Sequence, residues 1–168
     1  MPIAIVVMGV SGSGKTTLGS ALAARLGATF VEGDALHLPA NIAKMSAGVP
    51  LTDDDRAPFL DNVGRAIRAA ADARVVVSCS ALKRRYRDRL RAIASPVSFV
   101  LPLVARAVLE QRLAHRSGHY MPASLLDSQL ADLEPLGADE AGVTVDGTTS
   151  VGAQVDVIVD SLRSLLAQ

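Results

Sequence analysis

Short apolar runs alternate with longer amphipathic segments along this chain of 168 residues. The runs have the length of strands, and the segments between them are long enough for helices. This alternation is typical of a parallel sheet that helices cover on both faces, so the chain is expected to adopt a three-layer α/β fold. The strand-like runs lie at residues 3–8, 28–32, 74–79, 97–101 and 143–146.

The segments between the runs carry helix signals. Leucines recur at every fourth position from residue 18 to residue 26, which indicates one apolar face of a first helix. Gly27 is the expected end of this helix, because glycine often follows the last helical residue. Thr52 can cap a helix that continues to about residue 72, since the three aspartates that follow suit the positive end of the helix dipole. A last helix is expected over residues 151–166.

Composition narrows the class of protein. Hydrophobic residues make up 49% of the chain, which is enough for a buried core and excludes a disordered chain, and the length predicts one domain over residues 1–168. Lysine plus arginine and aspartate plus glutamate each total 17, so net charge does not favour nucleic acid or an anionic membrane as a partner. The single cysteine excludes an internal disulfide framework. No leader peptide precedes the first run and no apolar stretch reaches the about 20 residues that span a bilayer, so a cytoplasmic protein is expected.

A glycine-rich segment follows the first apolar run. It reads Gly-Val-Ser-Gly-Ser-Gly-Lys-Thr over residues 9–16, which is the spacing of a phosphate-binding loop. Glycines let backbone N–H groups approach phosphates at a helix N-terminus, where the dipole favours an anion. Lys15 is expected to reach the β- and γ-phosphates of ATP, and the Thr16 hydroxyl to ligate Mg²⁺. The first helix is expected to begin at Thr17. The predicted ATP contacts in this segment are Gly9, Val10, Ser11, Gly12, Ser13, Gly14, Lys15, Thr16 and Thr17.

Other residues distinguish among the classes of phosphate-loop protein. An Asp-x-x-Gly switch at the end of a strand and an Asn-Lys-x-Asp motif would indicate a GTPase, and the sequence has neither. The third strand ends without the acidic residue that motor ATPases place beside Mg²⁺. The second strand ends in Glu32 and Asp34, two residues apart and hence on one face. This favours a small-molecule kinase in which Asp34 accepts the proton of the substrate hydroxyl and Glu32 holds Mg²⁺ through water. A solvated strand end for Glu32 and a helix cap for Asp34 are the alternatives.

Two arginines precede an irregular segment and are predicted to contact ATP. Arg112 and Arg116 are four residues apart, so they share a face if one helix includes both. One guanidinium can stack on adenine while the other binds phosphate oxygens, which would place Arg116 with Lys15 and Asp34 among the catalytic groups. A solvated helix face is the alternative. The segment 116–124 contains glycine and proline and is interpreted as a lid.

With these residues identified, the chain resembles the gluconokinase family of shikimate-kinase-like phosphate-loop kinases over nearly its whole length. The most specific match is the stretch 33–60, which begins Gly-Asp-Ala-Leu-His and continues through Gly-Val-Pro-Leu-Thr-Asp-Asp-Asp-Arg. The further matches are residues 79–83, 86–88, 116–120, 133–136 and 139–140.

The resemblance implies ATP-dependent phosphorylation of D-gluconate at its 6-hydroxyl. It also implies a phosphate-loop NTPase fold with a five-stranded parallel sheet in the order 2-3-1-4-5, and a homodimer. The chain departs from the family pattern at four positions, none of which carries a charge assigned to the chemistry: Leu38 for proline, Phe59 for tryptophan, Tyr120 for phenylalanine and Gly137 for a bulkier residue.

A linear sugar acid needs a cation for its carboxylate and several polar groups for its hydroxyls. Arg56 is the first choice for the carboxylate or a nearby hydroxyl, and an ion pair with Asp53 or Asp55 is the alternative. Backbone N–H groups at Ser80 and Ala81 can receive substrate oxygens, since ligands of such sheets bind beyond the carboxyl ends of the strands. The remaining candidates for substrate contacts are His37, Lys44, Lys83 and His119. For His37 a capping role stays open as the alternative. For Lys44 and His119 the alternative is a solvated surface position.

Two further features have ordinary explanations. Cys79 is expected to be a small buried core residue. The basic cluster at residues 83–91 suggests nucleic acid, but Tyr86 is the only aromatic residue within it and the net charge is zero, so this role is rejected. Two alternatives to a gluconokinase stay open. One is a kinase for another small hydroxy acid such as shikimate, and the other is a non-catalytic nucleotide sensor, against which the intact loop and Asp34 argue.

Overall fold

The computed structural model describes residues 3–70, 72–116 and 123–166 of the chain. Among these residues, five strands form one sheet in the order β2-β3-β1-β4-β5, which confirms the expected order. Each neighbouring pair of strands is parallel. The strands are β1 (Ile3–Val7), β2 (Thr29–Glu32), β3 (Arg74–Ser78), β4 (Ser98–Leu103) and β5 (Gly142–Asp146).

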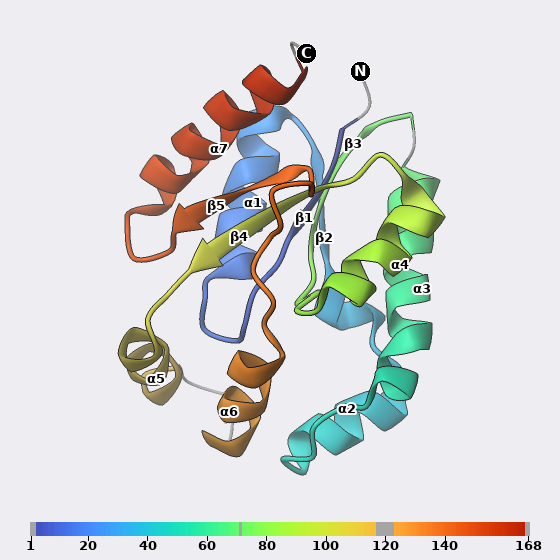
Figure 1. Cartoon of the computed structure of the whole chain (residues 1–168), viewed down its shortest axis with the longest axis vertical. Coiled ribbons are helices and arrows are strands. Elements are labelled where there is room, and N and C mark those ends of the chain that lie inside the picture. The colour runs from blue at the N-terminus through green and yellow to red at the C-terminus, as the bar shows by residue number, and fades with distance from the viewer. Residues whose placement is uncertain (1–2, 71, 117–122, 167–168) are drawn as a thin grey trace.

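Helices cover both faces of this sheet, as the alternating pattern predicts. Figure 1 shows α1 and α7 on one face and α3 and α4 on the other. No helix within the described ranges is long and apolar enough to cross a membrane. The helices are α1 (Lys15–Leu26), the 3₁₀ helix η1 (Gly33–Leu36), α2 (Pro39–Ser46), α3 (Asp53–Ala69), α4 (Arg84–Ala94), α5 (Arg106–Ala114), α6 (Ala123–Asp132) and α7 (Val151–Leu166).

The central strand β1 explains why the sequence pattern is so clear. Its residues Ile5, Val6 and Val7 are fully buried. Successive side chains of a strand point to opposite faces, so Ile5 and Val7 pack under α1 and α7 while Val6 packs under α3 and α4. A strand that is buried on both faces must be apolar throughout, which produces the unbroken run in the sequence.

Three helices extend beyond the carboxyl ends of the strands. Figure 1 shows α2, α5 and α6 there, below the sheet. A small apolar cluster fastens this region together, because Val10 of the loop after β1 packs with Leu109 of α5 and Leu126 of α6. The loop is therefore enclosed by helices that come much later in the sequence.

Some element boundaries differ from the expected ones. α1 begins at Lys15, two residues before the predicted start, and α3 ends at Ala69, before residue 72. α2 is not among the helices given a range from the sequence, although Pro39 at its first position is a typical helix start. The predicted cap of α3 is confirmed, and Thr52 forms a reciprocal capping box with Asp55.

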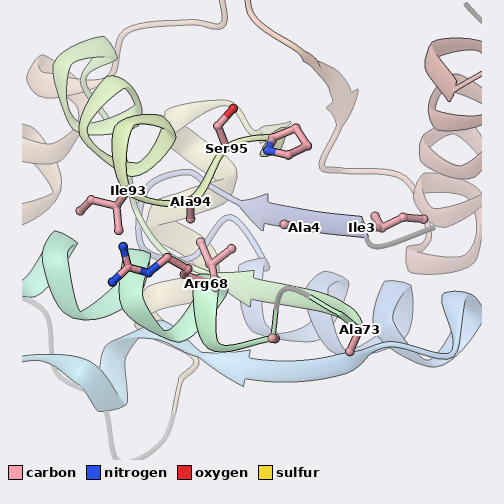
Figure 2. A pocket seen from close by; sticks show the side chains of 10 residues that line it. Ile3, Ala4, Arg68, Ala73, Ile93, Ala94 and Ser95 are labelled. Carbon is pink, nitrogen blue, oxygen red and sulfur yellow. The ribbon is translucent and has the colours of Figure 1, made fainter.

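A cavity of about 150 Å³ lies at the opposite edge of the sheet, near the amino ends of the strands (Figure 2). Ile3 and Ala4 of β1, Arg68 of α3 and Ile93 of α4 line it, and its walls are mostly apolar. Open parallel sheets bind their ligands beyond the carboxyl ends of the strands. The chemistry-bearing residues predicted from the sequence gather at that other edge.

Candidate active site

The segment between β1 and α1 has the backbone of a phosphate-binding loop. Gly14 caps α1 in the left-handed region at φ 92°, and Gly12 has a positive φ of 83°. A side chain at Gly12 would also be crowded, because its Cβ would lie 3.3 Å from Leu113 Cγ on α5. The loop therefore presents backbone N–H groups without intervening side chains at the N-terminus of α1, which suits an anion.

Lys15 lies where the loop becomes the helix. Its Nζ donates a hydrogen bond to Val10 O at 3.0 Å, so the side chain folds back over the loop. Burial lowers the pKa of Lys15, and the carboxylates of Asp34 and Glu32 act against that lowering. An ammonium in this position can exchange the carbonyl for phosphate oxygens.

Glu32 joins the loop to the sheet. Thr16 Oγ1 donates to Glu32 Oε2 at 2.6 Å, and Ser78 Oγ at the end of β3 donates to Glu32 Oε1 at 2.6 Å. Glu32 is therefore anchored, which rules out the alternative of a freely solvated strand end. The Thr16 hydroxyl and the Glu32 carboxylate are oxygen donors of the kind that Mg²⁺ prefers, so these residues fit the ion that the sequence predicts.

Asp34 follows in η1, and a close approach of two strand ends positions it. Gly33 N donates to Ser78 Oγ at 3.2 Å, and a Cβ on Gly33 would lie only 1.8 Å from Ser78 O. The Asp34 side chain makes no hydrogen bond to any of the described residues, and the N-cap of η1 is Glu32. Asp34 is thus not a helix cap, and its carboxylate is available at the site.

A cavity of about 230 Å³ collects the predicted phosphate-binding groups. Lys15 and Asp34 both line it, so the carboxylate predicted to act as the base lies in the same space as the lysine predicted to bind phosphate. The other lining residues are Ser11, Gly12, Gly14, Thr16, Thr17, Arg112 and Arg116. Of the predicted loop contacts, Gly9, Val10 and Ser13 do not line this cavity.

The two arginines reach this cavity differently from the prediction. α5 ends at Ala114, so Arg116 lies beyond the helix and the two residues do not share a helical face. Both nevertheless line the cavity. Arg112 donates to Gly12 O at 3.1 Å and to Gly147 O at 2.8 Å, which ties the loop to the turn after β5. Of the predicted lid, residues 117–122, which include His119, lie outside the described residues.

A second, smaller cavity of about 50 Å³ contains three of the predicted substrate residues, His37, Arg56 and Ser80. The His37 ring stacks on Phe59 with centroids 3.6 Å apart. Burial lowers the pKa of His37, with Asp34 acting in the opposite direction. The other residues that line this cavity are Met45, Pro50, Leu51, Phe59, Leu82, Leu125, Ser128 and Gln129.

Arg56 does not pair with Asp53 or Asp55, the alternative left open by the sequence. Its Nη1 donates to the Tyr86 hydroxyl at 2.9 Å and lies 3.4 Å from Asp132 Oδ2. The side chain is 13% exposed, so the guanidinium is held in one place with part of its surface toward the cavity. This is a suitable position for a cation that binds a carboxylate.

The remaining substrate candidates lie outside the second cavity. Lys83 Nζ is 3.6 Å from Asp132 Oδ1, beside the Arg56 network. Lys44 Nζ binds Asp55 Oδ2 at 2.8 Å and lines neither cavity. Ala81 is buried at φ 41° and its carbonyl accepts a hydrogen bond from Arg87. The geometry therefore gives more support to Lys83 than to Lys44 or Ala81 as a substrate contact.

Sequence reasoning missed three residues that shape the site. Gln129 accepts a hydrogen bond from the backbone N–H of Ser11 at 2.7 Å. Tyr86 and Asp132 hold Arg56 from α4 and α6. Tyr86 carried a signal because it belongs to the family match, whereas Gln129 and Asp132 lie in an ordinary helical pattern.

The basic cluster on α4 is balanced by local ion pairs. Arg87 is fully buried and forms a two-pronged pair with Glu140, at 2.7 and 2.8 Å. The neighbouring arginines also pair: Arg84 with Asp139, Arg85 with Asp53, Arg89 with Asp61 and Arg91 with Asp88. Cys79 is a buried core residue, as expected, and burial raises the pKa of its thiol to about 12.

Comparison with known proteins agrees with this geometry. A family model described as "AAA domain" matches residues 5–136. A gluconokinase of Gluconobacter oxydans (strain 621H) is 50% identical over 96% of this chain and 89% of that protein. A crystal structure of a gluconokinase from Sinorhizobium meliloti 1021 has a TM-score of 0.88 at 50% identity, covering 98% of this chain and 93% of that one. A sugar kinase from Janibacter sp. HTCC2649 has a TM-score of 0.92 at 44% identity, covering 97% and 95%. The resemblance seen in the sequence is confirmed, and the chain belongs to the gluconokinase family.

Proposed function

We propose that this chain transfers the γ-phosphoryl group of ATP to the 6-hydroxyl of D-gluconate, forming 6-phospho-D-gluconate. The observation that carries the proposal is the shared position of Asp34 and Lys15 in one cavity, with Arg56 in the next. A proton acceptor, a phosphate-binding cation and a carboxylate-binding cation are the groups that this reaction needs.

The roles of the residues follow from their positions. Asp34 accepts the proton of the attacking hydroxyl, and Lys15 and Arg116 bind the phosphoryl oxygens as negative charge spreads over them. Thr16 would hold Mg²⁺ directly and Glu32 through water, and the ion would supply further positive charge at the phosphates when bound. Catalysis then depends on positioning and electrostatics, because phosphoryl transfer through a loose transition state requires little covalent help from the protein.

The second cavity is proposed to hold the sugar acid. Arg56 binds the carboxylate, with Lys83 adding positive charge nearby, and Ser80 and His37 contact hydroxyls. Burial lowers the pKa of His37, which favours a neutral imidazole that can donate at one nitrogen and accept at the other. Asp132 balances Arg56 and Lys83 from α6, so a substrate carboxylate must compete with it.

A panel of acceptors tests the substrate. ADP release is measured with D-gluconate, other aldonates and shikimate at equal concentrations. We expect D-gluconate to give the highest kcat/KM. A preference for shikimate would instead indicate a kinase for another hydroxy acid, and ATP binding without turnover on any acceptor would indicate a nucleotide sensor.

The proposal includes four further properties, of which the family resemblance suggests the homodimer and the sequence pattern the other three. They are one kinase domain over residues 1–168, a lid over residues 116–124, a homodimer, and a place in the cytoplasm, where ATP is available. Light scattering on the purified protein tests the homodimer, because a dimer has twice the 17.5 kDa mass of the chain.

A further inference from the structure

Gln129 on α6 connects the two cavities. Its Oε1 accepts a hydrogen bond from the backbone N–H of Ser11, 118 positions earlier in the sequence, at 2.7 Å. Ser11 lines the phosphate cavity, whereas Gln129 lines the cavity of His37 and Arg56. One side chain therefore lines one expected ligand site and holds the backbone of a residue that lines the other.

The direction of this hydrogen bond fixes how the amide is turned. Ser11 donates, so the oxygen of Gln129 faces the loop and its NH₂ group faces away from it. The NH₂ group makes no hydrogen bond to the residues that the structure describes, and two donors remain for a ligand. A polyol acid carries several hydroxyl oxygens that can accept such a bond.

The bond to Ser11 uses the backbone N–H of one predicted ATP contact but leaves the N–H groups at the start of α1 to the phosphates. Ser11 precedes Gly14, the N-cap of α1, by three positions, whereas a helix binds an anion with the N–H groups of its first turn. Gln129 is also not needed to hold α6 in place. Leu125 and Leu126 of that helix are 5% and 2% exposed, and Leu126 packs with Val10 and Leu109.

We propose that Gln129 couples the two ligand sites of the enzyme. Its NH₂ group donates to a hydroxyl oxygen of the sugar acid while its oxygen holds Ser11, so that each ligand orders the wall of the other's site. The identity of the acid rests on the proposed function, but the coupling does not. Positive coupling arises when the first ligand orders part of the protein, because the second ligand then loses less free energy in ordering the same part.

The test measures binding of a non-hydrolysable ATP analogue by calorimetry, with and without gluconate, and of gluconate with and without the analogue. In the wild-type protein we expect each ligand to tighten the other by about 5-fold or more. Gln129→Met keeps the length of the side chain and removes both hydrogen bonds. Gln129→Asn keeps an amide that is one methylene too short to span both partners. Both should reduce the coupling to less than about 2-fold and weaken gluconate alone by about 2–10-fold.

Gln111→Met is the matched control, because Gln111 is an exposed glutamine on the neighbouring helix α5. It should leave the coupling unchanged. Thermal melting identifies a variant that fails to fold, and a purely structural role would lower the melting temperature while leaving the coupling factor unchanged. If the wild-type protein prefers another acid in the panel, that acid replaces gluconate, which separates failure of the proposed substrate from failure of this inference. Coupling that persists in both Gln129 variants overturns the inference, as does a wild-type protein in which no acid tightens the analogue.

Discussion

At the scale of single residues, two charged groups of opposite sign face one cavity without forming an ion pair. Lys15 Nζ binds Val10 O, and the Asp34 side chain makes no hydrogen bond within the described ranges. Each is held by its backbone: Lys15 by the start of α1, and Asp34 by the close contact of Gly33 with β3. Both therefore remain available to a ligand.

Replacement of Asp34 tests its role as the proton acceptor. Asp34→Asn keeps the shape of the side chain and removes its charge, so kcat should fall by about 100-fold or more. Binding of the ATP analogue should change by less than a few-fold, because the phosphates contact the loop. Steady-state kinetics and calorimetry measure the two quantities, with exposed Asp54→Asn as the control. If both residues tolerate the change equally, Asp34 is not the base.

A second residue-scale prediction concerns the buried pair between Arg87 and Glu140. The hydrogen bond from Arg87 is the main reason that the pKa of Glu140 is lowered from 4.5 to about 2. Because the folded-state pKa is the lower one, this contribution to stability is present above pH 4.5 and is lost as the pH falls toward about 2. Glu140→Gln leaves a buried cation without its partner and should cost about 3–5 kcal/mol at pH 7.

Denaturant unfolding from pH 7 to pH 2 checks this prediction. The wild-type protein should lose its advantage over Glu140→Gln as the acid form of Glu140 appears. Glu110→Gln is the control, since Glu110 and Arg106 form a pair in which both side chains are about half exposed. That change should cost less than about 1 kcal/mol. Equal effects of the two substitutions would show that burial of the Arg87 pair does not matter.

At the scale of elements, the β2–η1 junction is the most constrained connection of the site. A methyl group on Gly33 would collide with the backbone of β3, which cannot move without disturbing the sheet. Gly33→Ala should therefore shift Glu32 and Asp34 away from the loop, and a displacement of 1 Å at a catalytic group can cost about 100-fold in rate. Assays of kcat/KM and melting temperature measure the effect.

Gly152→Ala in α7 provides the matched comparison. A Cβ there meets nothing within 4 Å. Because alanine favours a helix more than glycine does, this change should leave activity unchanged and stabilise the fold by up to about 1 kcal/mol. Full activity in Gly33→Ala would mean that β2 and β3 can separate without moving Asp34.

Most elements could be predicted because the pattern of apolar residues in the sequence reflects which positions are buried. β1 is apolar throughout and β3 is apolar at its three central valines, since both faces of these strands are covered, and the cap of α3 is a local signal. The end of α5 was harder to predict from the sequence, because helix ends depend on contacts with distant residues. For that reason Arg116 lies beyond α5 while still facing the predicted cavity.

At the scale of the whole molecule, the site lies where the carboxyl ends of the strands meet helices from the second half of the chain. The loop residues, Glu32 and Asp34 could be predicted, since each belongs to a local motif at the end of a strand. Gln129 and Asp132 could not, because their partners Ser11 and Arg56 are far away in the sequence. Only the fold brings these residues together.

The same scale explains why the arginines of α4 do not indicate nucleic acid. Arg84, Arg87 and Arg91 face Asp139 and Glu140 in the loop before β5, and the pairs fasten that loop to α4. A sequence shows the charge of each residue but not the partner that neutralises it. The cluster is therefore a structural feature of this edge of the molecule.

Identification of the phosphorylated position tests the central claim most directly. The purified protein is incubated with ATP, Mg²⁺ and uniformly ¹³C-labelled D-gluconate, and the product is examined by ³¹P and ¹³C NMR. We expect one phosphate ester, coupled to carbon 6, and none with Lys15→Met, which lacks the phosphate-binding ammonium. A product phosphorylated elsewhere, no product with gluconate, or normal product formation by Lys15→Met would contradict the proposed function.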